Sequence, residues 1–226
     1  MTETIKSGDV IIMQAETTSG NALKLIDGLF SKKNLFTLSH ACLAYRCPIT
    51  NQLYVWEVGV VGDESFIISV KGRHKNWTHL SLWDEKMKTF EGTKVRVFVR
   101  RLKNKFNKSL DQKLFSYVVA KNLRRKYDWS LKFIIDRNSM HLLGSNEAII
   151  NTIFKDEINN RWHCGAFVIH AFYDANLMKH SVIEDTDQIL PYNIFFMPSE
   201  GYSWCKMKDG FYLENPELIL DFYPKS

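Results

Sequence analysis

Two strand-like stretches separated by a short turn constrain the fold more than any other feature of the sequence. Residues 39–46 and 52–60 are rich in apolar, aromatic and β-branched residues, and the five residues between them include Pro48 and Asn51. Proline and asparagine favour the backbone conformations of turns, and two such stretches joined by a short turn are typical of a β-hairpin. The sequence therefore predicts an antiparallel pair of strands over residues 39–60.

The other predicted strands lie mainly in the first half of the chain and the predicted helices mainly in the second half. Val95, Val97 and Val99 alternate with polar or larger residues, which predicts a strand over residues 94–101. Strands predominate in the first half of the chain and helices in the second, so we expect an α+β fold with a central antiparallel sheet. Ser109 and Gln112 have the spacing of a capping box, which predicts the start of a helix. Further strands are expected at 10–13, 65–70 and 78–82, a hairpin at 204–212, and further helices at 21–30, 146–154 and from 163 or 164 to about 177.

The composition fits one folded domain. The chain has 226 residues, of which 45% are apolar and 24% are charged, so it can bury a large core. No stretch approaches the roughly 20 continuous apolar residues of a membrane helix, and the first residues lack the pattern of a secretion signal. The four cysteines are too few for a disulfide scaffold. We therefore expect a single domain over residues 1–226, intracellular and cytoplasmic, with reduced thiols.

Cys164 is the strongest candidate for a chemically active residue. It stands where the polar and aromatic residues 161–163 give way to the apolar run 165–169, which is the point where we expect a helix to begin. Exposed backbone N–H groups and the helix dipole favour a thiolate in the first turn of a helix, and the same N–H groups can bind an oxyanion. A free thiol is only a few per cent ionised at neutral pH, so a nucleophilic Cys164 needs a base. A small buried side chain without chemistry is the alternative.

His40 is the best candidate for that base, with Glu57 as its partner. If residues 47–50 form the hairpin turn, His40 lies directly opposite Glu57, and opposed side chains share one face of a sheet. A carboxylate within the apolar residues 54–60 needs a partner, and a histidine can supply it. His79 is a weaker rival base. A purely structural pair, or a Glu57 that points to solvent, remains the alternative.

Five short motifs occur in an order that resembles a known family: Gly8-Asp9-Val10-Ile11, Ser39-His40, Tyr54-Val55-Trp56-Glu57, Tyr127-Asp128 and Cys164-Gly165-Ala166-Phe167-Val168. This order is similar to that of the circularly permuted NlpC-type papain-like cysteine hydrolases, which include YiiX-like bacterial proteins, poxvirus and other large-DNA-virus members, and the lecithin–retinol acyltransferase branch. The resemblance covers roughly residues 7–60 and 126–178. It implies a papain-like fold with the nucleophile at a helix N-terminus, in which Cys164 is the nucleophile, His40 the general base and Glu57 the orienting residue. Gly165 stands where many members have serine, and Cys42 where a small apolar residue is common.

The resemblance also suggests which residues contact substrate. Tyr127 and Asp128 line the cleft in this interpretation, together with Trp162, while residues 130–160 have no counterpart and are expected to cover or shape the cleft. A helix-terminal tyrosine followed by a capping aspartate is the alternative for Tyr127 and Asp128.

Other partners are less well supported by the sequence. His40, Cys42 and Cys164 lack the compact spacing of metal ligands, so we expect neither a metal nor another cofactor. The chain has a formal net charge of +5, with basic clusters at residues 100–105 and 121–126. Such runs are more often solvated faces than nucleic-acid sites, so specific nucleic-acid binding is not expected. Peripheral contact with an anionic membrane surface remains open, as does the oligomeric state.

These observations lead to one functional expectation with two alternatives. We expect a cysteine peptidase or amidase that cleaves a peptide, isopeptide or lipid-amide bond through an acyl-enzyme on Cys164. A thiol-dependent acyltransferase or esterase acting on lipids would use the same residues. A catalytically inactive binding module on the same fold is the third reading. An intracellular enzyme or a viral one, in the host cytoplasm or the virion, fits the lack of a secretion signal.

Overall fold

The computed structural model describes residues 4–15, 38–60, 76–123, 126–127, 161–162, 164–180, 189, 191–203 and 205–223. Its largest sheet has eight strands in the order β13-β5-β1-β2-β3-β4-β7-β8, and all its pairings are antiparallel except that of β7 with β8. The strands are β1 (Val10–Ala15), β2 (Leu38–Arg46), β3 (Leu53–Val60), β4 (Asn76–Leu82), β5 (Val95–Arg100), β6 (Leu102–Asn104), β7 (Lys126–Tyr127), β8 (Arg161–Trp162), β9 (Met178–His180), β10 (Gly201–Tyr202), β11 (Cys205–Met207), β12 (Phe211–Leu213) and β13 (Glu217–Asp221). The helices are α2 (Trp83–Lys88), α3 (Gln112–Asn122), α6 (Cys164–Asp174) and α7 (Pro191–Phe195).

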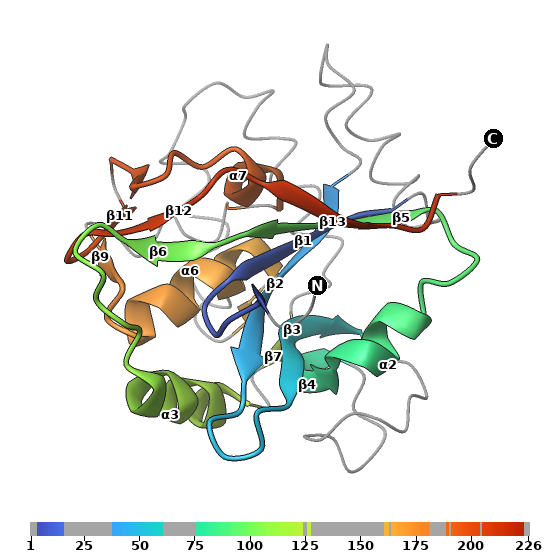
Figure 1. Cartoon of the computed structure of the whole chain (residues 1–226), viewed down its shortest axis with the longest axis horizontal. Coiled ribbons are helices and arrows are strands. Elements are labelled where there is room, and N and C mark those ends of the chain that lie inside the picture. The colour runs from blue at the N-terminus through green and yellow to red at the C-terminus, as the bar shows by residue number, and fades with distance from the viewer. Residues whose placement is uncertain are drawn as a thin grey trace, which may run out of the picture.

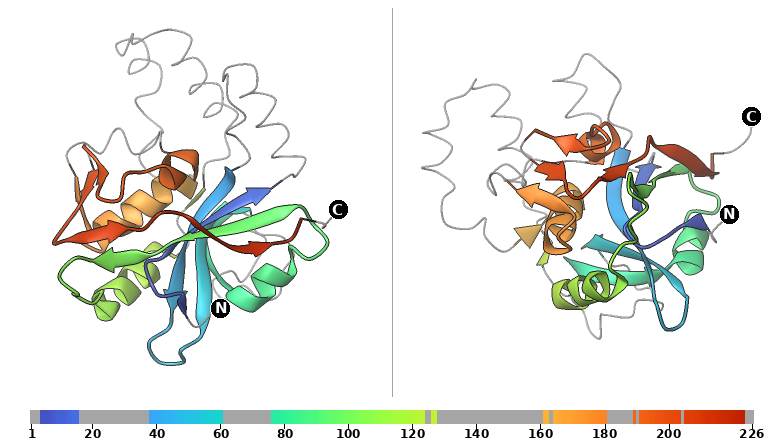
Figure 2. Two further views of the ribbon diagram at one scale, coloured as in Figure 1. Left: turned by 45° about the horizontal axis from the view of Figure 1, so that its top comes forward. Right: turned by 60° about the vertical axis from the view of Figure 1, so that its left-hand side comes forward.

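Both faces of the large sheet are covered. In β1, Val10 and Ile12 belong to one hydrophobic cluster, whereas Ile11 and Met13 belong to the cluster on the opposite face. This is why the strand is an uninterrupted apolar run rather than an alternating one. Figure 1 shows α3 and α6 on one side of β2 and β3 and α2 on the other. The views in Figure 2 show the same arrangement, and β13 lies alongside β5 as its antiparallel partner.

The β2–β3 hairpin confirms the predicted antiparallel pair, but its register differs from the expected one. Leu43 lies opposite Trp56, and Arg46 lies opposite Leu53. The turn is therefore two residues longer than expected, and the Cys47 N–H donates to the carbonyl of Gln52 at 2.9 Å. Asn51 adopts a positive φ of 56°, which asparagine tolerates better than most residues. A shift by two residues keeps each side chain on the face that the shorter turn predicted.

Two further local expectations are corrected. The residue that caps α3 is Asp111 rather than Ser109, because the Asp111 carboxylate accepts the N–H groups of Lys113 and Leu114. Asp209 and Gly210 do form a turn with positive φ, but the flanking strands do not pair with each other. Instead β11 pairs with β9 and β10, and β12 pairs with β6, so the predicted hairpin over residues 204–212 is wrong.

The described part of the chain is a mixed α/β structure with a mostly antiparallel sheet, as the division of the sequence predicts. The strands expected at 10–13, 78–82 and 94–101 are present, and α6 begins at Cys164. Short strands are also present after residue 177, although the sequence indicated that helices predominate in the second half of the chain. The elements expected at 21–30, 65–70 and 146–154, and the expected insertion at 130–160, lie outside the described residues. None of the helices described is long and apolar enough to cross a membrane.

Candidate active site

Helix α6 brings Cys164 to the middle of the large sheet. The apolar residues that follow Cys164 bury most of this helix, and the Phe167 ring packs edge-on against Trp56 of β3 with centroids 4.8 Å apart. The start of the helix is thereby held against β2, and Cys164 is only 7% exposed. The apolar run that predicted a helix in the sequence is therefore also what positions the thiol.

A gap in the strand pairing gives the thiol a polar environment. The described β2–β3 ladder ends at Leu43 and Trp56, whereas β2 continues to Leu38 paired with β1 alone. At this opening, the backbone N–H groups of Ala41 and Gly165 donate to the Cys164 sulfur. Burial raises the pKa of Cys164, but the hydrogen bond and positive charge of His40 and these N–H groups together lower it below its usual value.

His40 links the thiol to Glu57. Its Nε2 lies 2.9 Å from Glu57 Oε2, which leaves Nδ1 as the ring nitrogen available to the thiol. Burial lowers the pKa of His40, yet the hydrogen bonds and negative charges of Cys164 and Glu57 outweigh that effect and raise it to about 9. The opposite shifts of Cys164 and His40 favour a thiolate–imidazolium pair at neutral pH.

The contact between His40 and Glu57 is diagonal, which corrects the expected directly opposed pair. The last described pair of this ladder is Leu43 with Trp56, and extending the same register by one residue would set Glu57 opposite Cys42, two residues from His40. Diagonal neighbours on one face are about 7–8 Å apart at Cα, which is within reach of two long side chains. The residue directly opposite Glu57 is His79, on the neighbouring strand β4.

Glu57 is the centre of a buried polar cluster. It is 3% exposed, and its Oε1 lies 2.9 Å from Lys86 Nζ and 3.3 Å from His79 Nε2. The Ser81 hydroxyl donates to the same oxygen at 3.2 Å. Burial alone would raise the pKa of Glu57, but the charge of Lys86 and the hydrogen bonds of His40 and His79 hold it well below its usual value. Glu57 is therefore ionised throughout the physiological pH range.

The charges of the site balance when the thiol has given its proton to the imidazole. Cys164 and Glu57 then carry negative charges, and His40 and Lys86 carry positive ones. Buried charges are tolerated when each has a partner and its hydrogen bonds are satisfied. The arrangement can therefore hold the reactive form of a cysteine without a metal ion.

The sequence did not identify Lys86 and Ser81 as members of this cluster, and it indicated His79 only as a rival base. Lys86 comes from the short helix α2, which packs against the opposite face of the sheet from α6. No spacing pattern relates Lys86 to Glu57. The positions of Ser81 and His79 in the sequence weakly indicated such a role, because polar residues within a short apolar strand need a buried hydrogen-bond partner.

The expected substrate-contacting residues lie partly outside the described structure. Tyr127 of β7 is paired in parallel with Trp162 of β8. Trp162 precedes Cys164 by two residues. Asp128 lies outside the described residues. The structure therefore brings the backbones of Tyr127 and Trp162 together at the edge of the sheet.

A metal centre built on Cys42 receives no support. Its sulfur donates to the carbonyl of Ile11 at 3.6 Å, and burial raises its pKa well above the usual value. A protonated thiol is a poor metal ligand. Among the described residues, no group of three or more histidine, cysteine or acidic side chains has the arrangement of a metal site.

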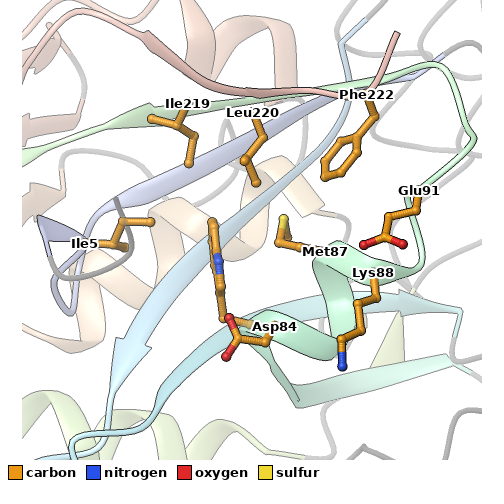
Figure 3. Close-up of a pocket in the computed structure, with 9 residues that line it drawn as sticks. Ile5, Asp84, Met87, Lys88, Glu91, Ile219, Leu220 and Phe222 are labelled. Atoms are coloured by element: carbon orange, nitrogen blue, oxygen red, sulfur yellow. The ribbon is translucent and has the colours of Figure 1, made fainter. Parts of the chain in front are cut away.

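A separate cavity lies on the side of α2 that faces residues 219–222 near the C-terminus. It has a volume of about 530 Å³, and its lining includes Met87, Ile219, Leu220 and Phe222. Figure 3 shows these side chains between α2 and the C-terminal strand, with Asp84, Lys88 and Glu91 at its margin. None of Cys164, His40 and Glu57 lines this cavity.

The site combines a cysteine at a helix start, a histidine beside it and a carboxylate that orients the histidine, which is the constellation used for nucleophilic catalysis. No protein-family model matches the sequence, and no curated protein matches it. The functional interpretation therefore depends on the chemistry of these side chains.

Proposed function

We propose that the protein is a cysteine hydrolase that cleaves an amide bond in a peptide, an isopeptide or a lipid amide. The observation that carries this proposal is the continuous contact from Cys164 through His40 to Glu57, with the pKa of the thiol lowered and that of the imidazole raised. A structural cysteine needs neither a base nor an opening between strands. The family resemblance supports the same three roles and a permuted papain-like fold.

The proposed reaction has two steps. In the first, the Cys164 sulfur forms a bond to the carbonyl carbon, and the imidazolium of His40 gives its proton to the departing nitrogen as the carbon–nitrogen bond breaks. In the second, His40 takes a proton from water, whose oxygen attacks the thioester carbonyl. The acid product then leaves, and the thiolate–imidazolium pair is restored.

Glu57 and the helix start have supporting roles in this reaction. Glu57 holds Nε2 of His40, so Nδ1 stays directed at the sulfur, and its negative charge stabilises the imidazolium. The backbone N–H of Cys164 lies in the first turn of α6, where it can donate to the oxyanion that forms on the carbonyl oxygen.

The acyl-enzyme would also serve an acyltransferase or esterase. An acyltransferase differs from the proposed hydrolase in the group that attacks the thioester, which is an amine or alcohol instead of water. An esterase differs in the group that leaves in the first step, which is an alcohol instead of an amine. Incubation with amide, ester and thioester substrates, with and without an added amine, separates these activities by the product formed.

The first test is the rate of Cys164 alkylation as a function of pH. Because hydrogen bonds around Thr50 also lower the pKa of Cys47, the measurement uses a Cys47→Ser background and follows the peptide that contains Cys164 by mass spectrometry. We expect a thiol pKa well below that of free cysteine, which rises in His40→Ala. A thiol with ordinary reactivity that is indifferent to His40 would contradict the proposal and favour a binding module.

A further inference from the structure

The positive charge of the protein is concentrated in one short segment. Residues 101–126 contain nine of the 30 lysines and arginines but one of the 25 acidic residues. The other 200 residues hold 21 basic and 24 acidic residues, so they carry a net negative charge. A charge asymmetry of this size indicates an interaction with an anionic partner more strongly than the net charge does.

The structure shows which of these charges are at the surface. Arg100, which adjoins the segment, is buried, and Arg101 is paired with Asp9 and Glu217. Lys105 forms an ion pair with Glu200. In contrast, Lys103, Lys108, Lys113 and Lys121 are exposed, and within the described part of the chain none of these four has a carboxylate at ion-pair distance.

Helix α3 arranges part of this charge in a stripe. Lys113, Tyr117 and Lys121 follow one another at intervals of four residues, so they lie on one face of the helix. The opposite face is buried through Phe115, Val118 and Val119. The exposed face therefore consists of two cationic side chains with an aromatic ring between them, and Tyr117 is 64% exposed.

Exposed apolar side chains also belong to two segments that adjoin the start of α3. Among the described residues, the three most exposed large apolar side chains are Ile49 at 92%, Phe106 at 69% and Tyr117 at 64%. Phe106 lies in the connection between β6 and α3, and Ile49 is at the tip of the β2–β3 hairpin. Pro48 and Gln112 line a common hollow, so the hairpin tip adjoins the start of α3, and Figure 1 shows both at one end of the molecule.

We propose that this surface, formed by Lys108, Lys113, Lys121, Ile49, Phe106 and Tyr117, docks onto an anionic phospholipid membrane. Lysines bind lipid phosphates and serine headgroups electrostatically, while exposed apolar side chains enter the boundary between headgroups and acyl chains. A nucleic acid would use the charges and the flat rings but has no comparable use for Ile49. This inference is independent of the proposed enzymatic function.

Co-sedimentation of the full chain with vesicles tests the surface. We expect binding to vesicles of phosphatidylcholine with phosphatidylserine, little binding to phosphatidylcholine alone, and weaker binding at high salt. The double variant Lys113→Glu/Lys121→Glu should lower the affinity by about tenfold or more, because each lysine near an anionic surface contributes to binding. Tyr117→Ser and Ile49→Ser, which leave the net charge unchanged, should each weaken binding several-fold.

A matched control separates the surface from the total charge. Lys179→Glu/Lys206→Glu changes the net charge by the same amount on two exposed lysines that face each other across β9 and β11. This control should retain binding. An equal loss in the control, equal binding to both kinds of vesicle, or binding to a single-stranded oligonucleotide but not to vesicles would overturn the proposal. Circular dichroism of each variant checks that it is folded.

Discussion

Two fully buried charges in the large sheet are stabilised in different ways. Glu57 is surrounded by side chains that can carry positive charge, namely Lys86, His79 and His40. Arg100 on β5 instead donates to the backbone carbonyls of Ile194, Met197, Leu213 and Glu214, at 2.7–3.3 Å. Burial lowers the pKa of Arg100 to about 10, so it keeps its charge at neutral pH.

The difference separates a structural charge from a chemical one. The carbonyls around Arg100 belong to α7, to Met197 just beyond it and to the segment around β12, so the guanidinium joins distant parts of the chain through backbone groups that do not exchange protons near neutral pH. Within the described part of the chain, the partners of Glu57 are all side chains, and His40 changes protonation during the proposed reaction. We therefore expect changes at Arg100 to affect folding and changes at Glu57 to affect reactivity.

Loss of Arg100 should have the largest effect on stability. Arg100→Met removes the donors for four buried carbonyls, and breaking such a buried charged network costs about 3–5 kcal/mol. Chemical denaturation measures this loss, and Arg100→Lys should recover only part of it because lysine has fewer donors in a different geometry. The alkylation rate of Cys164 in the folded fraction should stay unchanged. A slower rate there would show that the two buried charges are coupled.

Replacement of Glu57 should change the reactivity of Cys164 more than the stability of the fold. Glu57→Gln keeps the shape of the side chain but removes its charge, so the pKa of His40 should fall and that of Cys164 should rise. Once the thiol pKa exceeds the assay pH, each further unit of increase lowers the alkylation rate by about tenfold. The rate at alkaline pH, where the thiol is ionised in any case, should change much less. If the alkylation rate of Cys164 in Glu57→Gln depends on pH as it does in the wild type, Glu57 does not influence the reactivity of the thiol.

The same contrast explains what the sequence could predict. His40 and Glu57 were identifiable because side-chain parity along two adjacent strands survives a shift of two residues, so an incorrect turn length still placed them on one face. Cys164 was identifiable because its apolar run both begins the helix and buries it. The order of the motifs and the two-residue periodicity of the strands therefore contained most of the candidate site.

Long-range contacts account for what the sequence did not predict. Lys86 meets Glu57 only because α2 packs beside β3 and β4, and no local pattern encodes that packing. Arg100 looked like part of a solvated basic cluster, and only the return of the chain through α7 and β12 buries it. The pairing of β12 with β6, rather than with β11, likewise depends on the tertiary structure and not on the Asp209-Gly210 turn.

Lys86 gives a smaller but more specific test. Its charge lowers the pKa of Glu57, so in Lys86→Met the carboxylate should take up a proton at a higher pH. The pH below which the alkylation rate of Cys164 declines should then be higher than in the wild type. Below that pH the rate should be several-fold lower than in the wild type, and at alkaline pH it should change little. Lys86→Arg should restore the wild-type profile. Lys88→Met is the matched control on the same helix, since Lys88 is exposed and pairs with Glu85.

The smallest expected effect is a change in how stability depends on pH. Once the thiolate–imidazolium pair has formed, and between the ordinary pKa values of histidine and cysteine (about 6.5 and 8.5), the unfolded pair holds one proton on the Cys164 thiol and the folded pair holds one on the His40 imidazole, so the pair adds no slope to the unfolding free energy. In Cys164→Ala, the hydrogen bond and negative charge of Glu57 oppose the effect of burial on His40, and a His40 pKa that stays above 6.5 means that the folded state binds more protons than the unfolded state above that pH. Stability should then fall as pH rises, by at most about 1.4 kcal/mol per pH unit.

Urea unfolding of the wild type and Cys164→Ala at a series of pH values measures this difference, and comparison of the two curves cancels the titration of all other groups. The decrease in stability with rising pH should be absent from the double variant Cys164→Ala/His40→Gln, because this variant lacks the titrating imidazole. A wild type that loses stability over this range as steeply as Cys164→Ala would mean that Cys164 and His40 titrate independently. The contact between them would then be a packing contact, and Glu57 would stabilise its histidine as Arg100 stabilises its carbonyls, through structure alone.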